Sequence, residues 1–413
     1  MATLLVRGCV FGDSADGEVG DLLIEDGRIV ARGPGLALPE PADPDDERIE
    51  VDATGLVALP GAIDGLAHLA VPRGRDAPGD DLGSGTIAAA RGGVTTVVAP
   101  AIPALTETLD VGFHDAERRA SGNVFVDYAF LVGLGRPTAE TPERLRGVAF
   151  HRGFAGAYLD LDAVDQAAVA GPGAILRLAA VADAPITVRA AGRLGGEVER
   201  TRLITLANLG ALADIAPHMA PVVSKEAVDA LDGCIATASA GLAQLCLEEL
   251  PPGLEVRPGL VSVEDREAVW AALADGRLSG VVSDHRGEPL DGADDWVGIA
   301  SIELFVPALL THGVAAGRID LPTLCAIMAE RPARRLGLWP EKGSLRVGAD
   351  GDLLLVDPAA TWTVTPEGLE GRGKAPAWHG QELTGRVVHV FSRGDQIVAD
   401  GAPLFRPGRG RAV

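Results

Sequence analysis

The stretch LVALPGAIDGLAHLAV, residues 56–71, lies where the sequence changes from one pattern to another. Its first residues end an apolar run that starts near residue 49 and predicts a short β-strand. A second predicted strand begins at Gly61 and contains His68. Beyond it, apolar runs alternate with helical segments, which indicates βαβ units and a parallel sheet. Seven or eight such units over about 280 residues have the size of a (β/α)8 barrel.

The elements of this middle region are predicted from apolar runs and helical periodicity. Strands are expected at residues 61–71, 93–102, 124–133, 154–161, 185–191 and 278–284, with a weaker one at 218–224. Helices are expected at residues 84–92, 141–150, 173–184, 202–216, 224–233 and 263–276. Both ends of the chain are instead rich in predicted strands. An Asp26-Gly27 pair predicts a hairpin in the first, and Arg393-Gly394-Asp395 predicts a turn in the second.

Composition argues against several classes of partner. The net charge of −22 argues against nucleic acid and against anionic membranes. No apolar run reaches the roughly 18–20 residues that cross a bilayer, and no signal peptide is evident, so we expect a cytoplasmic protein. The four cysteines lie far apart, which predicts buried free thiols. Only three of the 36 basic residues are lysines: Lys225, Lys342 and Lys374.

Five ordered segments resemble the cyclic amidohydrolases, the family of dihydroorotases, dihydropyrimidinases, hydantoinases and allantoinases. Pro60-Gly61-Ala62-Ile63-Asp64 resembles the start of their first barrel strand, and the other segments are residues 83–98, 263–285, 302–338 and 343–358. The resemblance covers nearly the whole chain. It implies a (β/α)8 TIM barrel of amidohydrolase type with a small β-sandwich domain formed by both termini. The expected domains are the barrel, residues 57–338, and the β-sandwich, residues 1–56 and 339–413.

Active members of the family, as the resemblance implies, bind two metal ions through six side chains. These are two histidines on strand 1, a carboxylated lysine on strand 4, histidines on strands 5 and 6, and an aspartate on strand 8. The metals supply hydroxide and polarise the amide carbonyl, and the aspartate is the general base. The corresponding positions here are Leu66, His68, Tyr158, Arg189, Pro221 and Asp284.

Four of these six positions do not suit a metal ion. Leu66 has no lone pair, and Tyr158 cannot form the carbamate of a lysine. None of the three lysines lies near strand 4. Arg189 is a permanent cation that would repel a metal. Pro221 has no ligand atom, and His218, three residues away, would face the other side of the strand.

His68 and Asp284 alone cannot build a catalytic metal site, which normally takes three protein ligands. We expect His68 to be a polar residue at the barrel mouth, Asp284 to pair with Arg189, and His285 to be a strand-end residue. Substrate-binding positions of the family are changed as well, to Ala70 and Ile102. We therefore predict no catalytic residue, no metal and no cofactor. The other histidines show no ligand spacing: His114, His151, His312, His379 and His389.

The pattern of loss resembles the non-catalytic dihydroorotase-like subunit of bacterial aspartate transcarbamoylase. That resemblance implies a catalytically inactive, homodimeric assembly subunit that binds the transcarbamoylase catalytic subunit in pyrimidine biosynthesis. One alternative is a divergent amidohydrolase of cyclic amides with one metal or none, using His68, Asp284 and His285. Another is a ligand-binding regulator whose Arg189 holds an anion in the vestigial pocket.

Overall fold

The junction between the terminal sheet and the barrel lies at Pro60 and Gly61. In the computed structural model, β5 (Val57–Pro60) belongs to the terminal sheet and β6 (Ala62–Asp64) is the first barrel strand. A Cβ atom on Gly61 would lie 2.2 Å from Oγ1 of Thr95, so only glycine fits at this crossing. The structure describes residues 2–40, 43, 47–70, 79–104, 107–134, 137–161, 172–190, 196–231, 237–246, 262–286, 299–404 and 408–413.

Eight parallel strands form the barrel sheet, in sequence order from β6 to β13. The strands after β6 are β7 (Val94–Ala101), β8 (Asp127–Gly133), β9 (Phe154–Asp160), β10 (Ile186–Arg189), β11 (His218–Val222), β12 (Thr237–Gly241) and β13 (Gly280–Val282). A bridge between Ala67 and His285, just beyond β6 and β13, joins the first strand to the last. The predicted (β/α)8 barrel is therefore confirmed.

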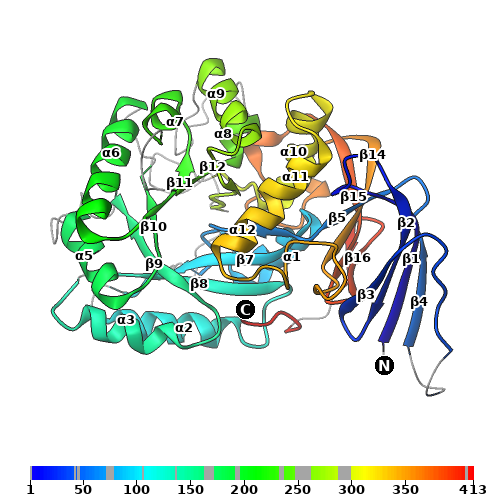
Figure 1. Cartoon of the computed structure of the whole chain (residues 1–413), viewed down its shortest axis with the longest axis horizontal. Coiled ribbons are helices and arrows are strands. Elements are labelled where there is room, and N and C mark those ends of the chain that lie inside the picture. Colours follow the sequence, from blue (N-terminus) through cyan, green and yellow to red (C-terminus); the bar gives the residue numbers. More distant parts are fainter. Residues whose placement is uncertain are drawn as a thin grey trace.

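Helices cover the outside of the barrel (Figure 1). They are α1 (Leu82–Arg91), α2 (Leu109–Ala120), α3 (Thr141–Ala149), α5 (Pro172–Ala182), α6 (Gly196–Ala213), α7 (Lys225–Leu231), α8 (Leu242–Cys246) and α9 (Val263–Ala274). After them come α10 (Phe305–Leu309), α11 (Leu321–Cys325) and α12 (Arg331–Arg335). Capping boxes fix two helix starts, because Asp81 caps α1 and Ser262 caps α9 through reciprocal hydrogen bonds.

Three barrel elements were absent from the sequence prediction: α2, β12 and the five-residue α8. Strand β12 has the sequence TASAG, whose small side chains lack the β-branched or aromatic character of a typical strand. Helix α2 contains Gly112, which weakens helix propensity. Its buried residues Phe113, Ala116 and Ala120 nevertheless follow helical spacing. Tertiary packing, more than local propensity, determines α2 and β12.

Both termini build the second, β domain, as predicted. Its strands are β1 (Ala2–Phe11), β2 (Val19–Glu25), β3 (Arg28–Gly33), β4 (Glu47–Asp52), β5, β14 (Leu353–Thr363), β15 (Glu382–Ser392), β16 (Asp395–Ala399) and β17 (Ala402–Pro403). They form one nine-stranded sheet in which β5 connects β1 to β14. Both predicted hairpin turns are confirmed, with φ of 46° at Asp26 and 48° at Arg393. The domain limits at residues 56 and 338 stay a prediction, and β5 lies at the first of them.

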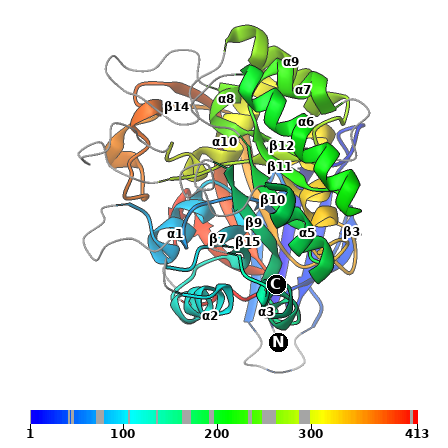
Figure 2. The same ribbon diagram turned by 90° about the vertical axis from the view of Figure 1, so that its left-hand side faces the viewer.

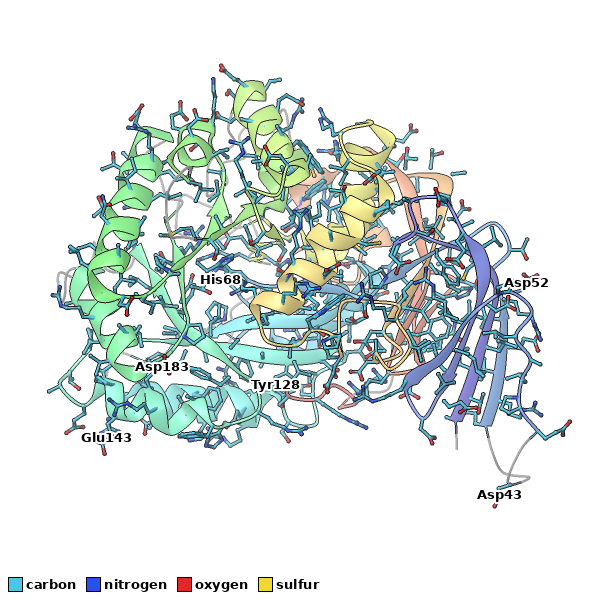
Figure 3. The ribbon with its side chains drawn as sticks, in the orientation of Figure 1. Asp43, Asp52, His68, Tyr128, Glu143 and Asp183 are labelled. Carbon is cyan, nitrogen blue, oxygen red and sulfur yellow. The ribbon has the colours of Figure 1, made fainter. Side chains whose placement is uncertain are left out.

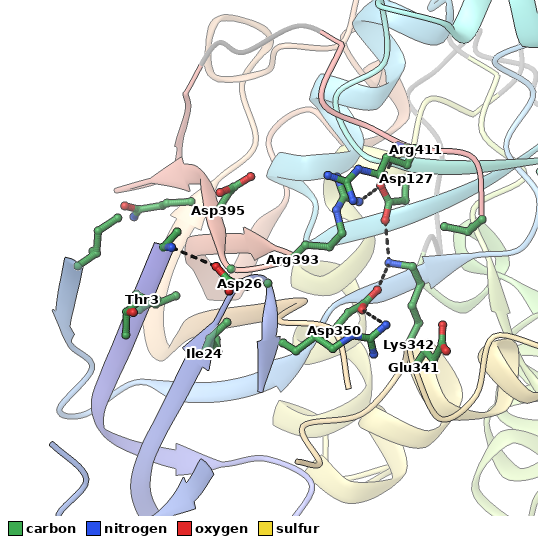
Figure 4. A pocket seen from close by; sticks show the side chains of 18 of the residues that line it. Thr3, Ile24, Asp26, Asp127, Glu341, Lys342, Asp350, Arg393, Asp395 and Arg411 are labelled. Carbon is green, nitrogen blue, oxygen red and sulfur yellow. Dashed lines mark hydrogen bonds and ion pairs between the residues drawn. The ribbon is translucent and has the colours of Figure 1, made fainter. Parts of the chain in front are cut away.

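A buried lysine links the β domain to the amino end of the barrel. Nζ of Lys342 lies 2.8 Å from Oδ2 of Asp127, at the start of β8, and 2.7 Å from Oδ2 of Asp352, just before β14. Arg393 also pairs with Asp127. Asp127, Lys342 and Arg393 border a cavity of about 690 Å³ between the two domains (Figure 4). Burial lowers the pKa of Lys342, but the charges of Asp352 and Asp127 outweigh it and raise the pKa overall.

Within the described part of the chain, no helix has both the length and the apolar character that a bilayer span needs.

Replacing the buried lysine should destabilise the protein strongly. Lys342→Met leaves Asp352 and Asp127 buried without their shared cation, and breaking such a pair costs about 3–5 kcal/mol of unfolding free energy. Chemical denaturation followed by circular dichroism measures the loss. Lys225→Met is the matched control, because Lys225 pairs with Glu264 at the exposed surface and should change stability little. Equal effects of the two substitutions would contradict the role of Lys342.

Candidate active site

The candidate site lies at the carboxyl ends of the barrel strands, where (β/α)8 enzymes carry their chemistry. Backbone hydrogen bonds join the segment after β6 to the segment after β13. The amide of Asp284 donates to the carbonyl of Leu66 at 3.0 Å, and the amide of His68 donates to the carbonyl of His285 at 2.9 Å. Barrel closure therefore brings His68 and Asp284 together inside the barrel, where Figure 3 labels His68.

Three buried side chains form the centre of the site. Nε2 of His68 lies 2.8 Å from Oδ1 of Asp284. On the other side, Nη2 of Arg189 donates to Oδ2 of Asp284 at 2.9 Å, and its Nε donates to Oδ1 at 3.1 Å. The predicted pairing of Asp284 with Arg189 is confirmed. Because the guanidinium is held by this carboxylate, the geometry does not favour the alternative in which Arg189 holds a ligand anion.

The charge state of the pair follows from its surroundings. Burial raises the pKa of Asp284, but the charge of Arg189 and the hydrogen bond from His68 outweigh it and hold the pKa well below its usual range. Burial, followed by the charge of Arg286, lowers the pKa of His68 to about 4. At neutral pH the imidazole is uncharged. Since an ionised carboxylate only accepts hydrogen bonds, Nε2 of His68 carries the proton and Nδ1 presents a lone pair.

Nδ1 of His68 and the hydroxyl of Tyr158 are both buried and have no hydrogen-bond partner among the described residues. The two rings meet edge to face, with centroids 6.2 Å apart. Burial and the charge of Asp160 raise the pKa of Tyr158 well above its ordinary value, so the phenol stays a donor. Buried polar groups are normally satisfied, so an open acceptor and an open donor on two rings that contact each other indicate a place for a polar ligand.

Neighbouring residues support the site. Nη2 of Arg286 lies 3.4 Å from Nε2 of His68 and 3.6 Å from Oδ2 of Asp160. His285 points elsewhere, since its Nε2 lies 3.2 Å from Oδ2 of Asp80 while its Nδ1 accepts from the amide of Ser301 at 3.1 Å. Both ring nitrogens of His285 are used in holding α1 and the segment around residue 301. The expectation of a strand-end structural residue fits this arrangement.

The residues present do not fit a two-metal centre. Leu66 is fully buried in an apolar cluster with Tyr158, Val98 and Val282, which fills the interior where a ligand would be needed. The guanidinium of Arg189 occupies the side of Asp284 that a metal would require. His218 lies at the start of β11, and its Nδ1 is 2.9 Å from Oγ1 of Thr237.

Sequence reasoning missed three features of the molecule. Tyr158 was counted only as a lost lysine, and Arg286 was not considered, although it directly follows the Ser283-Asp284-His285 run. His114 and His151 show no ligand spacing in the sequence, yet the fold brings them together with Glu117 on the outside of the barrel.

Comparison with known proteins gives matches over nearly the full length. The sequence profile of the amidohydrolase family matches residues 57–397. The D-hydantoinase of Geobacillus stearothermophilus is 28% identical over 475 residues, covering 100% of this chain and 96% of that protein. The D-hydantoinase of Streptomyces coelicolor is 29% identical over 454 residues, covering 98% and 96%. The crystal structure of dihydropyrimidinase from Brevibacillus agri matches with a TM-score of 0.89 at 25% identity, covering 100% of this chain and 98% of that one.

These relatives contradict the prediction of an inactive subunit of an aspartate transcarbamoylase complex. They are named as hydantoinases and a dihydropyrimidinase, and they align along the whole chain. The prediction that the chain is not an enzyme is wrong for the same reason. That prediction treats the loss of metal ligands as the loss of every group that can transfer a proton. His68 and Asp284, which can do so, remain paired at the barrel mouth.

The pKa of His68 predicts a specific pH dependence of stability. Its pKa is about 4 in the folded protein and 6.5 for the free side chain, so between these values only the unfolded chain binds the proton. Lowering the pH through this window should therefore reduce the unfolding free energy by about 3 kcal/mol through His68 alone. Urea denaturation across the window, compared with His68→Gln, isolates this contribution.

The variant should lose stability less steeply than the wild type as the pH falls. His379→Gln, which removes a histidine outside the barrel mouth, is the control and should follow the wild-type curve. Parallel curves for wild type and His68→Gln would contradict the burial of a neutral imidazole.

Proposed function

Because the chain belongs to the amidohydrolase family, we propose that it is a divergent hydrolase of cyclic amides with a reduced or absent metal site. The names of its relatives support five- and six-membered rings of the hydantoin and dihydropyrimidine class as substrates. In such a reaction, water adds to a ring carbonyl carbon and the ring C–N bond breaks. The product carries a carboxylate on the carbon side and an N–H on the nitrogen side.

The observation that carries this proposal is the hydrogen bond of 2.8 Å between His68 and Asp284. It fixes the imidazole with its Nδ1 lone pair open, in the way that a carboxylate orients a histidine base in hydrolytic triads. Nδ1 of His68 then takes a proton from the attacking water. The same proton passes to the ring nitrogen as the C–N bond breaks. Asp284 stabilises the imidazolium that exists between these two transfers.

Tyr158, on β9, supports the same reaction from another strand of the barrel. Its hydroxyl is a buried donor that lacks a partner among the described residues. A donor of this kind stabilises the negative charge that develops on the carbonyl oxygen as water adds. The low pKa of His68, about 4, keeps the imidazole in its base form at neutral pH but also limits its proton affinity. We therefore expect slow turnover.

Other expectations about the protein stay predictions. Buried unpaired Cys9, Cys246 and Cys325 support a reducing compartment such as the cytoplasm. A homodimer and the absence of a bound metal or cofactor are testable with the purified protein, by light scattering and by elemental analysis.

Hydrolysis of hydantoin, dihydrouracil and allantoin tests the proposal directly. The chelator-treated chain should open at least one of these rings, and added Zn²⁺ should not raise the rate. His68→Gln and Asp284→Asn should each lower kcat/KM by roughly 10²–10⁴-fold, the usual contribution of general acid–base catalysis. His379→Gln should leave the rate unchanged. Product formation is measured by chromatography, and circular dichroism confirms that each variant is folded.

Two results would count against this scheme. No ring opening with or without metal would refute a cyclic-amide hydrolase. Activity that requires added metal and persists in His68→Gln would keep the hydrolase but refute the role of His68 as base.

A further inference from the structure

Three side chains with metal-binding atoms meet on the outer surface of the barrel. His114 and Glu117 lie on α2, and His151 lies in the turn between α3 and β9. Nδ1 of His114 is 2.8 Å from Oε2 of Glu117, and Nδ1 of His151 is 3.8 Å from Oε1 of the same carboxylate. One ligand atom from each residue lies within 4.8 Å of the other two. The proposed chemistry at the barrel mouth uses none of these residues.

We propose that His114, Glu117 and His151 form a binding site for a divalent ion of the Zn²⁺ class. Imidazole nitrogen and carboxylate oxygen are preferred zinc ligands, and ligands about 2.0–2.1 Å from a tetrahedral ion lie roughly 3.3 Å from one another. The separations are 2.8 Å from His114 to Oε2 and 3.8 Å from His151 to Oε1 of Glu117, and all three ligand atoms lie within 4.8 Å of one another, close enough to converge on one ion. Three protein ligands leave the fourth position to water.

The backbone arrangement prepares this site. Residues three apart on a helix lie on the same face, so α2 presents His114 and Glu117 together. Helices α2 and α3 lie side by side along one edge of the molecule in both views (Figures 1 and 2). This packing brings His151, at the end of α3, over the face of α2. The site therefore depends on tertiary structure and joins two segments 34 residues apart (His151 minus Glu117).

A buried phenylalanine orients both imidazoles. The Phe113 ring is fully buried and packs edge to face on Phe130, with centroids 6.2 Å apart. The rings of His114 and His151 contact Phe113 at centroid distances of 5.5 and 5.7 Å, and their own centroids are 5.0 Å apart. Contacts with a fixed core residue limit the rotamers of the two ligands. A metal would thus bind with little rearrangement.

The charges beside the site partly cancel. Arg118 and Arg119 both pair with Asp115, which offsets part of their positive charge. The chain as a whole carries a net charge of −22, which attracts cations from solution.

The place of the site in the fold indicates a structural role. Helix α2 runs from the carboxyl end of β7 back toward the amino end of β8, and His151 precedes the amino end of β9. A bound ion would therefore cross-link α2 to the α3–β9 turn, away from the barrel mouth. Binding to the folded state alone raises stability in proportion to the logarithm of metal concentration.

Zinc binding by the purified full-length chain tests the proposal. Equilibrium dialysis against ZnCl2 with elemental analysis should give one bound ion, and Zn²⁺ should raise the Tm. Glu117→Gln and His151→Ala each remove a direct ligand. They should weaken Zn²⁺ binding by more than roughly 10–100-fold, which is the loss typical of removing a residue that hydrogen-bonds a ligand without touching the metal. Both variants should also lose the increase in Tm. His379→Ala, which removes a histidine elsewhere, should retain wild-type binding.

A further variant separates this site from the barrel mouth. His68→Gln should bind Zn²⁺ as the wild type does. The proposal is overturned if Glu117→Gln and His151→Ala bind with unchanged affinity, or if His68→Gln is the variant that loses the ion. It is equally overturned if the wild type binds no Zn²⁺.

Discussion

Closure of the barrel between its first and last strands is the constraint on which the site depends. The carboxylate of Asp64 accepts hydrogen bonds from the amides of Ser283, at 3.0 Å, and Leu66, at 3.2 Å. These bonds and the bridge from Ala67 to His285 hold the two strand ends in register. The chain then turns sharply at Asp284, whose φ of 47° lies in the left-handed region that aspartate tolerates better than most residues. The turn directs the Asp284 carboxylate into the barrel.

Charge compensation explains how the barrel mouth tolerates a buried Asp284. An uncompensated carboxylate in this environment would be too costly to keep ionised. In the family, by resemblance, metal cations face this position, whereas here the guanidinium of Arg189 does so, 2.9 Å away. The substitution replaces one source of positive charge by another and keeps the carboxylate ionised. It also leaves Asp284 able to orient His68, which a protonated acid would do less well.

The sequence predicted most of the fold because most elements have the apolar spacing of strands or helices. It failed at the five-residue α8, and at β12 and α2, where small residues or a glycine hide the pattern and packing decides. The Asp284–Arg189 pair was predictable from charge alone. The hydrogen bond from His68 and the open Tyr158 hydroxyl were not, because they depend on side-chain directions that closure of the barrel determines. The cluster of His114, Glu117 and His151 needed the packing of α2 on α3, which local spacing does not encode.

The two ends of the barrel have different roles, which explains why the residues at the barrel mouth differ from those of the family. Lys342, Asp127 and Asp352 join the domains at the amino end, and the segment ending at Val413 pairs with Tyr128 there. None of these contacts involves the positions that hold metal in the family. Substitutions such as Leu66, Tyr158 and Pro221 therefore changed the chemistry of the mouth without removing what holds the barrel to the β domain. A TM-score of 0.89 to a dihydropyrimidinase, at only 25% identity, is the expected consequence of such a division.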